Sequence, residues 1–133
     1  MRLSLLALLV PLAIGCQAPK KEVTPEQVQG LTKLDDVMAA QATYADPLMK
    51  KRDQLAFSDA EYASMIDASA RLQATSMKTK EFSKGPAFDD LAARLHGQAE
   101  ALGAAGQAKD SEKARAALTA MRDICRECHT KFR

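Results

Sequence analysis

A chain of 133 residues is long enough for one globular domain and short for two. Aromatic residues make up 5% of it and Trp is absent, so it offers little of the aromatic and β-branched material from which sheets are built, and the composition favours an all-helical fold. The formal net charge of +2 gives no sign of the strongly basic face that nucleic acids require, so we expect no nucleic-acid partner.

The first residues have the features of a secretion signal. Arg2 supplies a positive charge, and residues 3–12 form an apolar run that is too short to span a bilayer as a helix. We therefore expect a cleaved signal peptide over residues 1–16. Residues 17–23 are polar and lack periodicity, which predicts a flexible tether, followed by a single domain over residues 24–133.

The end of the signal, Leu-Ala-Ile-Gly-Cys over residues 12–16, resembles the site at which bacterial lipoprotein signals are cut before a cysteine that then carries lipid. The bulky aliphatic residue expected at Ala13 stands one place earlier. We expect lipidation of Cys16; an ordinary signal peptide cut after Ala18 is the alternative. Gln17 is not an inner-membrane retention signal, which favours an outer-membrane anchor facing the periplasm, whereas without lipid the protein would be secreted into the periplasm.

A first helix is expected to begin at Thr24, because Thr24 is a good N-cap, Pro25 suits the first helical position and Gln27 completes a capping box. Apolar residues then recur at helical spacing: Val28, Leu31, Leu34, Val37, Met38 and Ala42. Asp46 precedes Pro47 and should avoid the α region, so the helix is expected to be interrupted there, although Pro47 could start another turn through residues 48–49.

A second helix is expected from Ser58, which forms a capping box with Glu61. One face of it carries Tyr62, Met65, Ile66, Ser69, Leu72 and Met77. The helix should run out near Lys80, before a loop at Gly85. Residues 78–81 are mostly charged and are expected to form a solvated face.

The rest of the chain predicts two more helices, joined by a polar connection at residues 109–111 in which Ser111 is the expected N-cap. The third carries the apolar stripe Phe88, Leu91, Leu95, Gln98, Leu102 and Ala105, and the fourth carries Ala114, Ala117, Leu118, Met121, Ile124, Cys125 and Cys128. The two cysteines continue an apolar stripe and should point into the core. Four such helices with short connections predict an all-α antiparallel four-helix bundle in which the first and last helices lie side by side.

Residues 125–129 read Cys-Arg-Glu-Cys-His, the pattern of covalent c-type haem attachment. Each thiol adds to one haem vinyl group, and the next imidazole lies beneath the iron as its proximal ligand. A redox dithiol, a disulfide and half a zinc site are the alternatives. A dithiol of the thioredoxin kind is expected at a helix N-terminus, and zinc would need a second pair of ligands, for which His96 is a poor candidate. The chain has three cysteines, and assigning Cys16 to lipid and the other two to haem leaves none over.

A haem motif on the last helix of a bundle, followed by Phe132 and Arg133, resembles the class II c-type cytochromes, the cytochrome c′ family. The resemblance implies covalent haem c with thioethers at Cys125 and Cys128, His129 as proximal iron ligand, and Arg133 near the haem, against a propionate or the distal face. It also implies redox partner proteins and allows a homodimer through the first two helices, for which no residue here fixes a seam.

In this family the distal residue comes from the first helix: leucine in five-coordinate members that bind gases, methionine in six-coordinate electron carriers. Met38 lies on the apolar face of that helix, and Leu34 stands where gas-binding members often carry arginine. We therefore expect Met38 to be the distal ligand of an extracytoplasmic electron-transfer protein. The alternatives are Met38 as core filler beside an open site that binds nitric oxide or carbon monoxide, and His96 as a ligand. No Ser/His/Asp set or phosphate loop is present, so we expect no enzyme.

Overall fold

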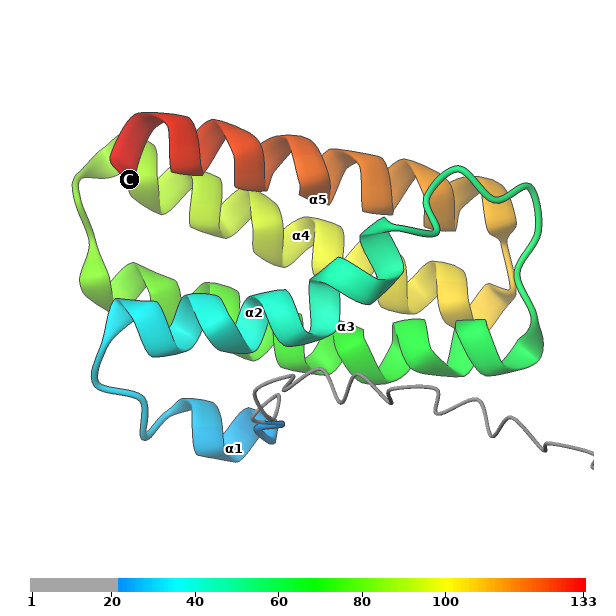
Figure 1. Ribbon diagram of the computed structural model, residues 1–133, viewed down its shortest axis with the longest axis horizontal. Coiled ribbons are helices and arrows are strands. Elements are labelled where there is room, and N and C mark those ends of the chain that lie inside the picture. The colour runs from blue at the N-terminus through cyan, green and yellow to red at the C-terminus, as the bar shows by residue number, and fades with distance from the viewer. Residues whose placement is uncertain (1–21) are drawn as a thin grey trace, which may run out of the picture.

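Four long helices run alternately in opposite directions and form an antiparallel bundle, as Figure 1 shows. They are α2 (Leu34–Met49), α3 (Asp59–Thr79), α4 (Pro86–Ala108) and α5 (Ser111–Phe132); the short helix α1 (Pro25–Val28) precedes them, and a 3₁₀ turn (Lys80–Phe82) follows α3. The computed structural model describes residues 22–133, so the predicted signal peptide, the lipidation candidate Cys16 and tether residues 17–21 lie outside the described residues. Within residues 22–133 there is no strand, and the predicted all-α four-helix bundle is confirmed.

The predicted first helix is wrong in two respects. It is divided into α1 and α2, because the helix ends at Val28 and the next stretch contains Gly30, a residue that disfavours helix. The predicted interruption at Asp46 does not occur, since α2 continues through Pro47 to Met49. Pro47 removes one backbone donor, its own, and the helix continues for only two residues beyond it. In Figure 1 the last turn of α2 changes direction toward α5.

The capping box at the start of α3 is confirmed. Ser58 Oγ accepts a hydrogen bond from the Glu61 backbone N–H (3.3 Å), and Glu61 Oε2 accepts one from the Ser58 N–H (2.8 Å). Lys51 Nζ lies 2.7 Å from Glu61 Oε1 and ties the preceding connection to the helix. The Lys51 ammonium, followed by the Ser58 N–H, lowers the pKa of the Glu61 carboxyl to about 2.

The predicted cap of the last helix is wrong by one residue. Asp110 is the N-cap of α5, and its Oδ1 accepts a hydrogen bond from the Lys113 N–H at 3.0 Å. A carboxylate caps a helix N-terminus at least as well as a hydroxyl does, so Asp110 takes the position. Ser111 is the first helical residue, and its hydroxyl instead bonds the Tyr62 hydroxyl of α3 (2.6 Å).

The predicted solvated face at residues 78–81 is also wrong in part, since Lys78 and Thr79 are buried. Lys78 Nζ donates hydrogen bonds to the backbone oxygen of Gln29 (3.0 Å) and to Glu81 Oε2 (2.6 Å). A buried ammonium is tolerated when it is paired in this way. Lys78 thus fastens the connection between α1 and α2 to α3. Conversely, Ile66 and Met77, predicted on the apolar face of this helix, are exposed.

Val23, which the sequence places in the tether, is buried and packs with Val28 and Ala40. Its backbone N–H donates to the Tyr44 hydroxyl (2.8 Å), and its backbone oxygen accepts from Tyr44 (2.9 Å) and from Arg71 (2.8 Å). Tyr44 belongs to α2 and Arg71 to α3, so the chain is fastened where it enters the seam between these two helices.

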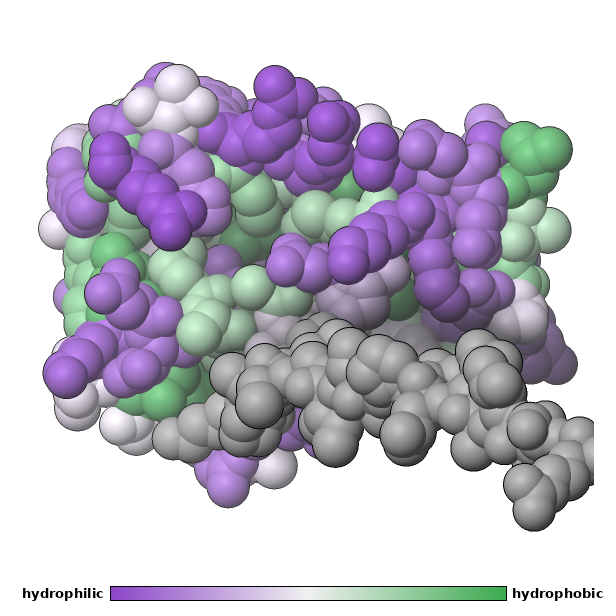
Figure 2. All heavy atoms as spheres, viewed as in Figure 1, coloured by the Kyte–Doolittle hydropathy of each residue, from purple (hydrophilic) through white to green (hydrophobic). Residues whose placement is uncertain are grey.

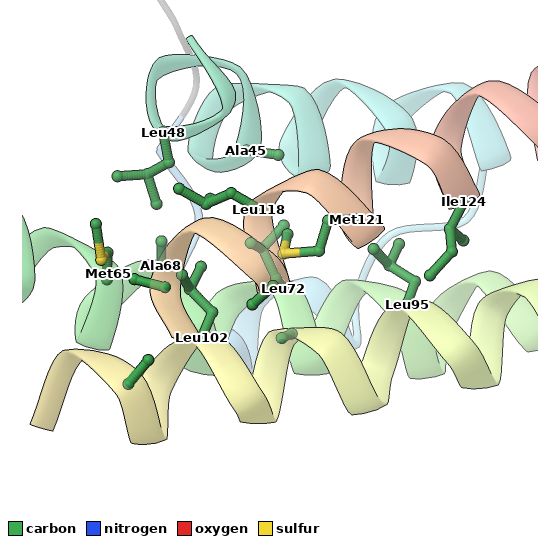
Figure 3. Close-up of a cluster of buried hydrophobic side chains, with 14 of the residues drawn as sticks. Ala45, Leu48, Met65, Ala68, Leu72, Leu95, Leu102, Leu118, Met121 and Ile124 are labelled. Atoms are coloured by element: carbon green, nitrogen blue, oxygen red, sulfur yellow. The ribbon is translucent and has the colours of Figure 1, made fainter. Parts of the chain in front are cut away.

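The main core lies between α3, α4 and α5, where Leu72, Leu102, Leu118 and Met121 are almost completely buried (Figure 3). α2 adds Ala45 and Leu48 at the edge of this cluster. α3 and α4 approach very closely, since a Cβ at Gly103 would overlap Ser69 Oγ and lie 2.9 Å from Ser69 Cβ. By contrast, α2 makes few contacts with α5. None of the helices within residues 22–133 has the length and apolar content needed to cross a bilayer.

Gly103→Ala tests the close approach of α3 and α4. We expect it to lower the free energy of unfolding by about 1–3 kcal/mol, because the added methyl group overpacks the contact with Ser69. The matched control is Gly97→Ala on the exposed side of α4, where a Cβ meets nothing within 4 Å, so that it should stabilise the protein by about 0.5–1 kcal/mol. Chemical denaturation measures both, and equal effects of the two variants would contradict the contact.

Glu61→Gln tests the carboxylate of the capping box. The pKa of Glu61 is lower in the folded chain (about 2) than its ordinary value of 4.5, so its stabilising effect is complete above about pH 4.5 and is lost as the pH falls toward 2. The variant should therefore melt below the parent at pH 7, and the two melting temperatures should converge near pH 2. Lys51→Met removes the largest cause of the lowered Glu61 pKa. In the Lys51→Met background, Glu61→Gln should therefore lower the melting temperature at pH 7 by less than it does in the parent. A gap that stays constant over this pH range would contradict the depressed pKa.

Candidate functional site

The last turns of α5 carry the Cys-x-x-Cys-His motif. Cys125 and Cys128 lie almost one helical turn apart and are partly buried against the main core, as their place in the apolar stripe predicts. His129 follows directly and is exposed at the edge of the bundle. The two thiols and the imidazole are therefore presented by one rigid helix.

Two adjoining cavities lie beside this motif. The first, of about 230 Å³, is lined by Met38, Gln41, Ala42, Ala45 and Met49 of α2, by Leu91, Ala92 and Leu95 of α4, and by Cys125, Cys128 and His129 of α5 among others. The second, of about 270 Å³, is lined by residues that include Leu34, Met38, Lys84, Phe88, Cys128, His129 and Arg133. Met38, Thr79, Cys128 and His129 line both. We refer to the two cavities together as the α2–α5 trough.

Figure 2 shows this part of the molecule as a band of apolar atoms between the hydrophilic surfaces of α5 and α2. Its walls are made of small or apolar side chains such as Ala42, Ala45, Ala92 and Leu95. Alanine at these positions leaves room that a larger side chain would fill. The trough is thus a mostly apolar space with both cysteines of the motif on one wall.

Antiparallel packing brings Met38 to the motif. The first turns of α2 lie beside the last turns of α5 (Figure 1). Met38 and His129 therefore line the same space from two different helices. Met49 also lines the first cavity, but it lies eleven residues further along α2, about 16 Å along the helix axis, and does not line the second cavity. Of the two methionines, Met38 is the one that accompanies His129 in both cavities.

The cysteine environment argues against the other uses of the motif. Burial raises the pKa of the Cys125 thiol to about 11, with Cys128 and Asp46 adding to the effect, and burial also raises the pKa of the Cys128 thiol. An activated dithiol would have lowered values. The two thiols are not joined in a disulfide. Among residues 22–133 no group of three or more His, Cys, Asp or Glu side chains is placed to hold a metal ion, so a zinc site lacks its ligands.

The donor set of the trough fits a haem. Two thiols and an adjacent imidazole are the groups that hold haem c, and the opposite wall supplies a thioether, a ligand found in cytochromes. Arg133 is exposed and lines the second cavity, as does Lys84, whose Nζ donates to the backbone oxygen of Phe132 at 2.8 Å. Arg133 and Lys84 both lie where they could form ion pairs with the carboxylates of a haem. The sequence alone gives no signal that Lys84 lies beside the motif.

His96 does not line either cavity. Its Nδ1 lies 3.4 Å from Ser76 Oγ and 3.3 Å from the backbone oxygen of Gln73, and its Nε2 lies 3.6 Å from Glu100 Oε1. These contacts hold the imidazole on the side of α4 that faces α3. The geometry gives no support to His96 as a haem ligand.

Sequence reasoning missed a buried polar pair on the wall of the trough. Gln41 Nε2 donates a hydrogen bond to Thr79 Oγ1 at 3.0 Å, and both side chains are buried. A signal for Gln41 was available, since it follows Met38 by three residues and therefore shares its helix face. Thr79 could not be found in this way, because it stands in a charged stretch at the end of α3.

Comparison with known families gives one match. The sequence profile of the family described as "Cytochrome C'" matches residues 26–133, which cover α2 to α5 and all of α1 except its first residue. No curated protein and no solved structure matches the chain. The matched segment contains the whole bundle, the Cys-x-x-Cys-His motif and the trough beside it. The chain therefore belongs to the cytochrome c′ family, the haem-binding class II c-type cytochromes.

Proposed function

We propose that this protein is a monohaem electron carrier in which Cys125 and Cys128 hold haem c by thioethers and His129 and Met38 are the two axial ligands of the iron. One observation carries the proposal: Met38 and His129 line both cavities of the α2–α5 trough from opposite helices. Family membership supports the haem, and the geometry of the trough supports this choice of ligands.

The two helices perform different tasks in this proposal. α5 presents both attachment points and the proximal imidazole on its last turns, so the position of the haem is set by one element. α2 brings the thioether from the opposite wall and closes the distal side with Ala42 and Ala45. When bound, the haem supplies one-electron oxidation and reduction at iron, with redox partner proteins as donor and acceptor. A thioether held by a packed helix favours the same coordination in both oxidation states, which suits electron transfer.

The proposal includes the location of the protein. Cys16 is the proposed lipid attachment point, residues 1–16 are the cleaved signal, and the domain faces the periplasm from the outer membrane. We assign no catalytic turnover to the chain. Arg133 and Lys84 are proposed to pair with the haem propionates from the second cavity, since both line it.

Met38→Ala tests the distal ligand in the purified holoprotein. The parent should give a low-spin ferric absorption spectrum with a methionine-to-iron charge-transfer band. The variant should lose that band completely, become high-spin and bind carbon monoxide readily, because the one methionine that lines both cavities together with His129 is removed. The matched control is Met49→Leu, which alters another methionine of the same helix and the same cavity and should leave the spectrum unchanged.

Two outcomes would overturn the ligand assignment. If the parent is already high-spin and binds nitric oxide or carbon monoxide, the protein is a five-coordinate gas-binding member of the family and Met38 only packs beside the open site. If Met49→Leu abolishes the band and Met38→Ala does not, the ligand is the other methionine. His96→Ala should leave the spectrum unchanged in either case, because His96 lies outside the trough.

A further inference from the structure

Gln41 is a buried amide on a wall made mostly of apolar side chains. It lies on α2 one turn after Met38, lines the first cavity and is 8% exposed. Its nearest neighbours on this face of the helix, Ala42 and Ala45, offer no polar group, and the next polar residue of α2 that lines the cavity is the exposed Asp46. Burying an amide in such surroundings is unfavourable unless both of its ends find partners.

The hydrogen bonds around Thr79 fix which end of the amide faces which way. The Thr79 hydroxyl has a single hydrogen, and it donates that hydrogen to the backbone oxygen of Thr75 at 2.8 Å. Toward Gln41 it can therefore only accept, so the amide nitrogen faces Thr79, at 3.0 Å. The amide oxygen is consequently turned away from Thr79, and none of the hydrogen bonds formed within residues 22–133 is donated to it. It is not among the fully buried side-chain atoms that lack a partner, so it borders open space, and Gln41 lines the first cavity.

We propose that Gln41, held by Thr79, lowers the reduction potential of the haem by presenting its amide oxygen to the trough. The inference rests on the proposed function insofar as it requires a haem in the trough, but it holds whether or not Met38 is the sixth ligand. Ferric haem carries one more positive charge than ferrous haem. The negative end of the amide dipole therefore stabilises the oxidised state, and the apolar walls strengthen its effect by keeping the local dielectric low.

Thr79 has the role of a positioning residue. An unanchored glutamine could turn its amide away through its side-chain torsions, whereas the bond to Thr79 restrains it in one orientation. Thr79 is itself buried and tied back to α3, so the restraint comes from a second helix. The potential is thus set jointly by a side chain of α2 and one of α3, neither of which belongs to the attachment motif.

The test is the midpoint potential of the purified holoprotein, measured by spectroelectrochemical titration in parent and variants. Gln41→Leu removes the dipole at similar volume and should raise the potential. Gln41→Glu replaces the dipole with a negative charge and should lower it. Thr79→Val leaves the amide without its anchor and should raise the potential by less than Gln41→Leu does. Opposite shifts from two substitutions at one site are not expected from simple loss of packing.

The matched control is Ser69→Ala, another buried hydroxyl of α3, which donates to the backbone oxygen of Ala99 at 2.7 Å and lies outside the trough. It should leave the potential unchanged. The absorption spectrum of each variant, recorded before the titration, shows whether the axial ligands are retained. Only variants that keep the parental spectrum enter the comparison.

An unchanged potential in Gln41→Leu, or a shift of the same sign in Gln41→Leu and Gln41→Glu, would overturn the inference. If Gln41→Glu does not retain the haem, Gln41→Leu and Thr79→Val still test the inference, since each of them must raise the reduction potential. Failure of the proposed function is seen separately: a parent protein without covalent haem refutes haem attachment before any titration, and a high-spin parent refutes Met38 as ligand while leaving the test of Gln41 intact.

Discussion

The antiparallel pairing of α2 with α5 is the constraint on which the site depends. Because these helices run in opposite directions, the start of α2 lies beside the end of α5, and Met38 and His129 line the same two cavities although they are far apart in the chain. Alanines at positions 42, 45 and 92 keep that seam open. On the other side of the bundle, Gly103 lets α3 and α4 pack closely against each other, in contrast to the open space between α2 and α5.

Much of this arrangement could be predicted from the sequence. The apolar residues of α4 and α5 recur at a clear helical spacing, and a polar connection at residues 109–110 separates the two helices. The Ser58 capping box marks the start of α3. Where prediction failed, two local signals competed. Gly30 outweighed the apolar periodicity around it, whereas Pro47 came too near the end of α2 to stop it. At the start of α5, Asp110 and Ser111 could each have capped the helix. Asp110 is the cap, and the Ser111 hydroxyl forms a hydrogen bond with the Tyr62 hydroxyl.

The polar residues of the interior could not be predicted, because their burial depends on partners from other helices. Lys78 is buried since Gln29 and Glu81 satisfy its ammonium, and Thr79 is buried since Gln41 reaches it from α2. The methionines pose the same problem: Met65 and Met121 fill the core and Met77 is exposed, although a pattern of apolar residues treats them alike. Only the three-dimensional arrangement separates them from Met38.

The fastening of Val23 has a mechanical consequence. Force applied along the residues that precede it is taken up by Tyr44 and Arg71, at the seam between α2 and α3. The opposite seam, between α2 and α5, contains the trough, and α5 makes none of these hydrogen bonds. A load applied at the N-terminal end of the domain would therefore pass into α2 and α3 and not directly into α5, the helix that carries the attachment motif.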